Sequence, residues 1–505
     1  MSATTAARGE APATAPLRAG RWGERRRRRV ADLTVGVLLL AVAGWRWSVL
    51  AALPGPVGVD GGNWLRLFRA LLGQVDVQDV VVPPLVPLLA GLADLAVGPL
   101  AATRLLAAVA AVAPAAGAWW VLRHRWTAGR GAAALAGVLT LSLVGPVGAA
   151  AAWGGVPQLL GLGLLPVALT ATAVAVTRPS RSRWRRAGAA AALVAITSTL
   201  ATVLLACGTL AVLAVAAGRT GRRAFVGVRS ALLPLAPVTL LYGVILTRMS
   251  LPDGRATAAV GLRALQDGLG APTPVWLGLV VALLTVTTVA LRRDEDRSMT
   301  LLLVGLSGAA VAGVVLGDVR FVAAVPTAVT LAATLPGPRG RPLDLVRGVA
   351  LAGLVVLAVI GASSAARDVA FYRQFAPATL LDDAREVAAR VPAGERVAVP
   401  PVAGAPAGWW LQALGVDAAV ASRSDWLSFP AERAAAAEVM ALFTRSGWPD
   451  TRVGAEACRL GLAWLYVPDR WGGMDPGALA RETGAGRLTA VADLPGGVLL
   501  RSAAC

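Results

Sequence analysis

Residues 25–52 read RRRRRVADLTVGVLLLAVAGWRWSVLAA, a run of five arginines followed by an apolar stretch. That stretch, 31–52, is roughly 20 residues long, enough for a helix to cross the ~30 Å hydrocarbon core of a bilayer. No small-residue cleavage site follows it cleanly, so we expect a retained first span rather than a cleaved signal peptide. This stretch alone predicts an integral membrane protein.

The composition of the whole chain agrees with that prediction. Of its 505 residues, 56% are hydrophobic and 15% are charged, and the mean hydropathy is +0.65. Soluble domains carry about 25% charged residues. The formal net charge is +19, but its arginines cluster in short runs between apolar segments, which is the positive-inside pattern of a polytopic membrane protein. We therefore expect membrane lipids as partners and no nucleic acid.

Placing the arginine-rich loops at the cytoplasmic face predicts about eleven spans. The single crossings are expected at 31–52, 99–122, 131–149, 157–177, 230–248, 274–291, 299–317, 320–336 and 346–364. Residues 187–217 would form one helix of about 46 Å, and its two basic flanks would then lie on opposite faces. We therefore expect two short spans there, with a bend near ITSTLAT, residues 196–202.

The last part of the chain, 366–505, differs from the rest in charge balance and in its predicted secondary structure. It holds 14 arginines against 15 acids, whereas residues 1–365 hold 34 against 14. Helical and strand-like patterns alternate along it, with helices expected at 377–391 and 430–443, and strands at 395–401, 417–422, 460–468 and the hairpin 488–502. The sequence therefore predicts a mainly α fold: a polytopic membrane bundle followed by a small extracytoplasmic α/β domain.

This gives three segments: a basic cytoplasmic N-terminal segment at 1–30, a transmembrane domain at 31–365 with an outer loop at 53–98, and the extracytoplasmic domain at 366–505. Cys458 and Cys505 both fall in the last segment. A disulfide between them would survive outside the cytoplasm. Alternatively, the two cysteines do not pair and the end of the chain frays.

The outer loop opens on GVDGGNWLRLFRALLG, residues 58–73. From Trp64 onward its apolar residues recur at helical spacing, which predicts an amphipathic helix at the lipid–water boundary. Prolines at 83, 84 and 87 should break the next apolar segment, so that it packs beside the membrane or re-enters it.

Asp60 has two interpretations. Asp60 or Asn63 caps the helix, with Asn63 better placed directly before Trp64. Alternatively, Asp60 is a general base, because a carboxylate at the low-dielectric edge of a bilayer can have a raised pKa. Two glycines follow Asp60 and keep bulk away from it.

Several of these features together resemble the GT-C superfamily of membrane glycosyltransferases. They are the first outer loop opening on an Asp, the segment PPLVPLL, the span ending LLAAVAAVAPAAGAWWVLRHR, the stretch AAWGGVPQLLGLGLLPVALTATAVAV and the element GDVRFVAAVPTAV at 317–329. The resemblance implies a polyprenyl-phosphate-linked sugar as donor and a cell-envelope glycan, lipid or protein as acceptor. Asp60 matches the family's first-loop acid, which deprotonates the acceptor hydroxyl in an inverting displacement.

The leaving phosphate needs a cation, and arginine suits it through bidentate geometry. Arg320 is the first candidate, with a local ion pair to Asp318 as its alternative role. Arg255 is a weaker candidate. Asn63 and Trp153 complete the candidate substrate-binding set, Trp153 either stacking on a sugar or anchoring the chain at the interface.

Two departures from the family pattern stand out. Many members pair two acids in the first loop, whereas Gly61 follows Asp60 here, and the second outer loop has no acid around Trp153. We therefore expect no cofactor; a divalent metal stays open, but the sequence does not support one. A transporter or flippase of lipid-linked saccharides and a non-catalytic envelope-assembly protein remain as alternatives.

Overall fold

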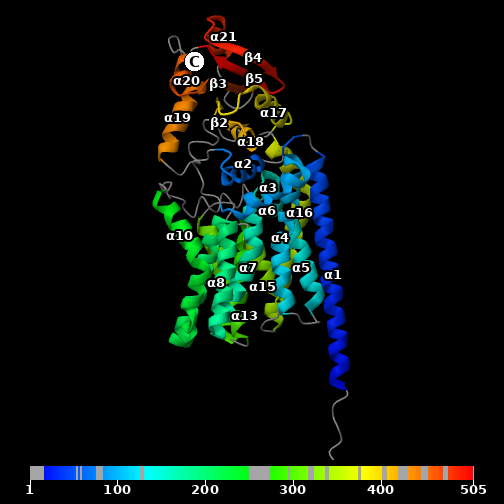
Figure 1. The fold of residues 1–505 in the computed structure, drawn as a ribbon. Helices are drawn as coiled ribbons and strands as arrows, with labels where there is room; N and C mark the ends of the chain where they lie inside the picture. Colours follow the sequence, from blue (N-terminus) through cyan, green and yellow to red (C-terminus); the bar gives the residue numbers. More distant parts are fainter. Residues whose placement is uncertain are drawn as a thin grey trace, which may run out of the picture.

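The computed structural model describes most of the chain, and all structural statements below refer to that part. The described residues are 16–52, 55–56, 60–75, 83–125, 130–248, 273–293, 296–316, 324–335, 340–373, 377–400, 407–418, 430–444, 453–469, 476–503 and 505. They form a helical bundle, a layer of two shorter helices at one end of it, and a C-terminal α/β domain beyond that layer (Figure 1).

Each predicted span corresponds to helical structure. The bundle contains α1 (Pro16–Ala51), α4 (Pro99–His124), α5 (Gly131–Leu143), α6 (Gly145–Trp153), α7 (Val156–Thr177), α8 (Arg181–Thr197), α9 (Thr199–Thr220), α10 (Leu232–Arg248), α12 (Thr273–Arg293), α13 (Arg297–Leu316), α15 (Ala324–Thr334) and α16 (Arg341–Arg373). Eight helical stretches in the described residues are long and apolar enough to cross a membrane. Shorter helices such as α8 and α15 account for part of the difference from the eleven expected.

The predicted bend in 187–217 is present. Ser198 lies between α8 and α9 in an extended conformation, and its hydroxyl accepts a hydrogen bond from the Ala201 amide. A Cβ on Gly161, near the start of α7, would lie 2.7 Å from the Ser198 Cβ. At the other end, a Cβ on Gly227 would lie 3.2 Å from the Arg181 amide nitrogen. The chain therefore rises along α8 and returns along α9.

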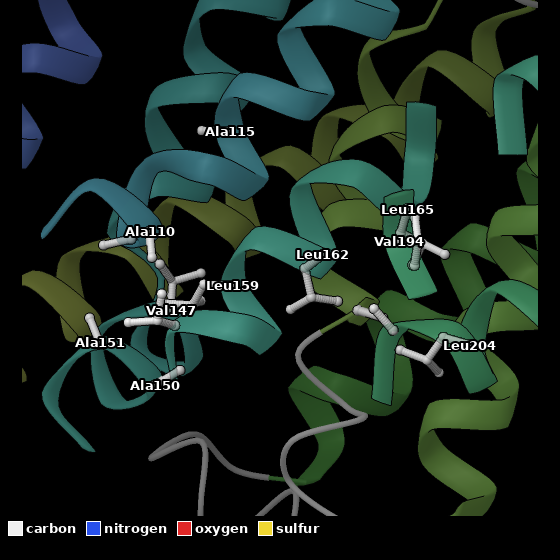
Figure 2. Close-up of a cluster of buried hydrophobic side chains, with 14 of the residues drawn as sticks. Ala110, Ala115, Val147, Ala150, Ala151, Leu159, Leu162, Leu165, Val194 and Leu204 are labelled. Carbon is white, nitrogen blue, oxygen red and sulfur yellow. The ribbon is translucent and has the colours of Figure 1, made fainter. Parts of the chain in front are cut away.

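The core of the bundle is built from small and aliphatic residues on α4, α6, α7, α8 and α9 (Figure 2). α4 and α7 approach most closely at glycines: a Cβ on Gly117 would lie 1.8 Å from the Gly163 carbonyl oxygen. Small residues let helix backbones touch in a membrane, where no hydrophobic drive brings helices together. The alanine-rich and glycine-rich composition is therefore a packing property.

The two ends of the bundle differ. At one end, called here the basic end, ion pairs join neighbouring helix termini: Arg125 to Asp296 at 2.8 Å and Arg130 to Asp344 at 3.3 Å. The other end, called the domain end, carries α2 (Gly61–Leu71), α3 (Leu85–Val97) and the C-terminal domain. The arginine-rich loops at the termini of these helices gather at the basic end, as the sequence predicts.

The C-terminal domain has the predicted mixture of elements. Its helices are α17 (Leu380–Arg390), α18 (Ala407–Ala413), α19 (Pro430–Thr444), α20 (Val453–Arg459) and α21 (Pro476–Gly484), and its strands are β1 (Arg396–Ala398), β2 (Asp417–Ala418), β3 (Trp464–Pro468), β4 (Leu488–Leu494) and β5 (Gly497–Ser502). They form a five-stranded sheet in the order β2-β1-β3-β5-β4. β1 is parallel to β2 and β3, while β5 is antiparallel to β3 and β4. Cys458 and Cys505 form a disulfide, which ties the C-terminal residue to α20.

Two boundaries differ from the sequence expectation. α1 starts at Pro16, so residues 16–30 of the basic segment extend the first span as one helix. α16 runs to Arg373, past the expected boundary at 365. Polar residues continue a helix into water as long as they have helical propensity, and hydropathy alone does not detect that extension.

Candidate active site at the domain end of the bundle

Two loops meet at Asp60. The Asp60 amide donates a hydrogen bond to the Trp153 carbonyl oxygen at 3.1 Å. The Trp64 indole N–H donates to the Gly154 carbonyl oxygen at 2.9 Å. Gly154 has a φ of +96°, and a Cβ there would lie 3.1 Å from the Asp60 Cβ. The structure therefore brings the two sequence candidates Asp60 and Trp153 together, and it requires glycine at 154.

Neither Asp60 nor Asn63 caps α2 with its side chain. Asp60 occupies the N-cap position, but its carboxylate makes no capping hydrogen bond. The expectation that Asn63 precedes the helix is wrong, because α2 begins at Gly61 and Asn63 lies in its first turn. The Asn63 side-chain oxygen instead accepts a hydrogen bond from Arg66 Nε at 2.7 Å. The half-buried Asp60 carboxylate is thus not committed to starting the helix.

The glycines after Asp60 accommodate the C-terminal domain. A Cβ on Gly62 would lie 3.0 Å from the Trp410 ring, and one on Gly61 would lie 3.2 Å from the Thr103 methyl group. Trp410, on α18, is fully buried. The expected open space beside Asp60 is therefore filled on this side by an indole from a segment about 350 residues further along the chain.

The basic face of α2 contacts α18 rather than lipid headgroups. Arg66 is 2% exposed. Its Nη1 donates to the Gln412 side-chain oxygen at 3.2 Å, and its guanidinium lies 5.7 Å from the centre of the Trp409 ring. Arg69 donates to the Ala413 carbonyl oxygen. The prediction of a helix at the lipid–water boundary is therefore wrong for this face, because the domain covers it.

α3 agrees with the expectation for the proline-rich segment. It starts after Pro84 and is 13 residues long, too short to cross a bilayer. Its leucines at 88, 92 and 95 are exposed. Burial raises the pKa of Asp94 at its C-terminal end, and Arg69 opposes that rise.

The remaining candidates are placed as follows. Asn63 is buried and engaged with Arg66, while the half-buried Trp153 ring lies over Gly155, where a Cβ would meet its Nε1 at 1.8 Å. Arg320 and Arg255 lie outside the described residues, as does Asp318. Among the described residues, no group of three or more His, Cys, Asp and Glu side chains could hold a metal ion.

The sequence reasoning missed two buried arginines, Arg46 and Arg347. Arg46 lies near the domain end of α1 and is 3% exposed. Among the described residues, the Arg46 Nε and Nη2 have no hydrogen-bond partner, and a Cβ on Gly148 of α6 would lie 2.8 Å from Nη2. The charge of Asp368 on α16 acts on it. The available signal was a single arginine inside an apolar span, which is costly unless it is used.

No protein-family model and no curated protein matches the chain. Two solved structures of ArnT from Cupriavidus metallidurans are similar to it over nearly its whole length. The apo structure has a TM-score of 0.59 and 15% sequence identity, covering 94% of this chain and 99% of that chain. The structure bound to undecaprenyl phosphate has a TM-score of 0.58 and 16% identity, covering 92% and 97%. The chain therefore has the fold of ArnT over nearly its whole length.

Proposed function

We propose that this chain is a membrane glycosyltransferase that transfers a sugar from a polyprenyl-phosphate donor to a cell-envelope glycan, lipid or protein. The observation that carries the proposal is the position of Asp60. Asp60 stands where the two loops meet, directly before the glycines that pack against Trp410 of the C-terminal domain. The fold shared with ArnT, one structure of which holds undecaprenyl phosphate, supports a lipid-linked donor.

In the proposed reaction Asp60 acts as general base. It takes the proton of the acceptor hydroxyl as that oxygen attacks the anomeric carbon. The bond from the anomeric carbon to the phosphate oxygen breaks, the electron pair leaves with the polyprenyl phosphate, and the configuration inverts. The transition state has oxocarbenium character, as in glycoside chemistry.

The other candidate residues have matching roles. Arg320 stabilises the leaving phosphate, with Arg255 as a second cation, because arginine binds phosphate through two parallel hydrogen bonds. Asn63 and Trp153 contact the substrate beside Asp60. In this proposal side chains alone carry out each step, without a metal or cofactor.

We place this reaction on the outer face of the cytoplasmic membrane, with the N-terminus inside. The protein is multi-pass, with the arginine-rich helix ends gathered opposite the C-terminal domain. The positive-inside rule then assigns the basic end to the cytoplasm. The Cys458–Cys505 disulfide supports an oxidising compartment for the domain.

The test compares lipids and envelope glycans from cells that lack the protein, complemented with wild type, Asp60→Asn or Asp94→Asn. Asp94→Asn is the matched control, since it removes one carboxylate from α3 at the same end of the bundle. We expect the deletion strain to accumulate a polyprenyl-phosphate sugar and to lose one glycan linkage. Wild type and Asp94→Asn should restore both, and Asp60→Asn should restore neither at equal membrane abundance.

Full restoration by Asp60→Asn would refute Asp60 as the base. Accumulation of the lipid-linked sugar in the inner leaflet alone, measured by accessibility to a membrane-impermeant glycosidase, would instead indicate a flippase.

A further inference from the structure

A second site lies at the basic end of the bundle, far from Asp60 along α1. A cavity of about 440 Å³ lies between α1 and the end of α4. Its lining residues are Arg25, Arg28, Arg29, Asp32, Arg123 and His124. Arg25, Arg28 and Arg29 follow the i, i+3, i+4 spacing that places side chains on one face of a helix. The cavity is therefore built from three arginines of α1 opposite a basic pair on α4.

The acidic groups near this cavity are already paired. Asp32 accepts hydrogen bonds from Arg123 at 3.0 Å and from the Trp119 indole at 3.2 Å. Glu24 pairs with Arg28 at 3.0 Å. Within the part of the chain that the structure describes, Arg25 and Arg29 have no ion pair with an acid. The cavity thus presents two uncompensated guanidinium groups, and a group with negative charge fits it.

The surface next to the cavity is apolar. Counting along α1 from Arg25 in steps of four and then three residues leads to Arg29, Leu33, Val37 and Leu40, which share one side of the helix. Leu33 is 70% exposed and Leu40 is 74% exposed. On this side of α1 the last arginine, Arg29, lies one turn before Leu33, at the level where hydrocarbon meets headgroups. One face of α1 therefore carries arginines followed by an exposed apolar track, Leu33, Val37 and Leu40, along the bilayer.

We propose that this cavity and track bind an anionic phospholipid, with the phosphate of its headgroup on Arg25 and Arg29 and an acyl chain along Leu33 to Leu40. Arginine holds phosphate oxygens through two parallel hydrogen bonds and is weakly hydrated, so it suits a site at the membrane surface. A soluble phosphate would use the arginines but not the exposed apolar track. The continuity of the two therefore favours the lipid.

The experiment uses the purified full chain in detergent micelles doped with phosphatidylglycerol or phosphatidylcholine, with retained lipid measured by native mass spectrometry. The cavity variant is Arg25→Gln with Arg29→Gln. The control is Arg185→Gln with Arg186→Gln, which removes the same charge from two exposed residues of α8, outside the cavity lining. Each arginine near an anionic surface contributes about fivefold. The cavity variant should therefore lose about 30-fold in affinity for phosphatidylglycerol and the control less than about threefold.

An equal loss in both variants would mean diffuse attraction, and the site would be refuted. Millimolar inorganic phosphate that displaces the lipid completely would refute the lipid in favour of a soluble phosphate. Arg25 and Arg29 are exposed, so the variants should fold, which size-exclusion chromatography checks. If the cavity variant aggregates, the wild-type protein still tests the proposal. The proposal is overturned if the wild type binds phosphatidylglycerol no more tightly than it binds phosphatidylcholine.

Discussion

Replacing Trp410 by alanine should open the contact between the C-terminal domain and α2. Trp410 is fully buried and lies against Gly61 and Gly62, the two residues after Asp60. Truncating a buried Trp to Ala costs about 3–5 kcal/mol, from lost transfer energy and the cavity left behind. The hydrogen bonds from Arg66 and Arg69 to α18 remain. The loss should therefore appear as local opening rather than global unfolding.

The assay is hydrogen exchange of the α2 and α18 amides in lipid nanodiscs. A loss of 3 kcal/mol corresponds to exchange faster by at least about a hundredfold, since each 1.4 kcal/mol is a factor of ten. Trp410→Phe should recover part of the protection, because the ring still fills some of the space. Trp120→Ala, on the exposed surface of α4, is the control and should change little. Exchange of α2 within about threefold of wild type in Trp410→Ala would refute the reasoning.

Three further predictions concern other parts of the molecule. Gly154→Ala should lower the free energy of unfolding by about 1–2 kcal/mol, because alanine disfavours the left-handed backbone at this position, and thermal unfolding measures this loss. The new Cβ would also press on Asp60 and should slow sugar transfer strongly, which the transfer rate measures. Arg46→Met should destabilise the fold, because the half-buried Asp368 carboxylate loses the positive charge that acts on it, and adding Asp368→Asn should recover part of the loss in a double-mutant cycle. Burial raises the pKa of Asp383 above its ordinary 3.8, opposed by a hydrogen bond from Tyr466. Its protonated form is favoured in the fold, so the free energy of unfolding should fall as the pH rises from 3.8 through the raised pKa, and Asp383→Asn should flatten that slope in pH-dependent melts.

Two of these three predictions have a control variant. Gly44→Ala adds a Cβ that meets nothing within 4 Å and should leave transfer unchanged. If Arg46→Met melts at the wild-type temperature, the Arg46 charge does not stabilise Asp368 in the fold, and this prediction is refuted. Glu386→Gln, one turn further along α17, should keep the wild-type pH slope. A slope unaltered in Asp383→Asn would exclude Asp383 as its source.

The membrane part of the fold could be predicted because lipid leaves few options. A backbone in hydrocarbon must satisfy its own hydrogen bonds, so long apolar stretches become helices and arginine-rich loops mark one face. The bend at Ser198 followed from the same rule, since a 31-residue crossing would put basic flanks on both faces. The strands of the C-terminal domain follow from short apolar runs separated by turn residues, as at β4 and β5.

The site could be predicted only in part. Asp60 stands out as the one acid of residues 58–73, where the outer loop opens, and Trp153 by the two glycines that follow it. Nothing local to 58–73 says that Arg66 meets Gln412, 346 residues away. The same spacing that indicates a membrane-surface helix also fits a helix covered by a domain. The start of α2 was misplaced for a related reason, since Gly61 and Gly62 are poor helix formers held there by Trp410.

The short helix α8 has a consequence for the bilayer itself. Its 17 residues span about 25 Å, and four of the first six are arginines. The apolar part of α8 is therefore about half as long as the hydrocarbon core of a bilayer is thick. α3, with its exposed leucines, contacts α8. Such hydrophobic mismatch makes the surrounding lipid thin out or the protein tilt. Bilayer thickness thus becomes a variable that shifts α3, and with it α2, so sugar transfer should depend on the acyl-chain length of the host membrane.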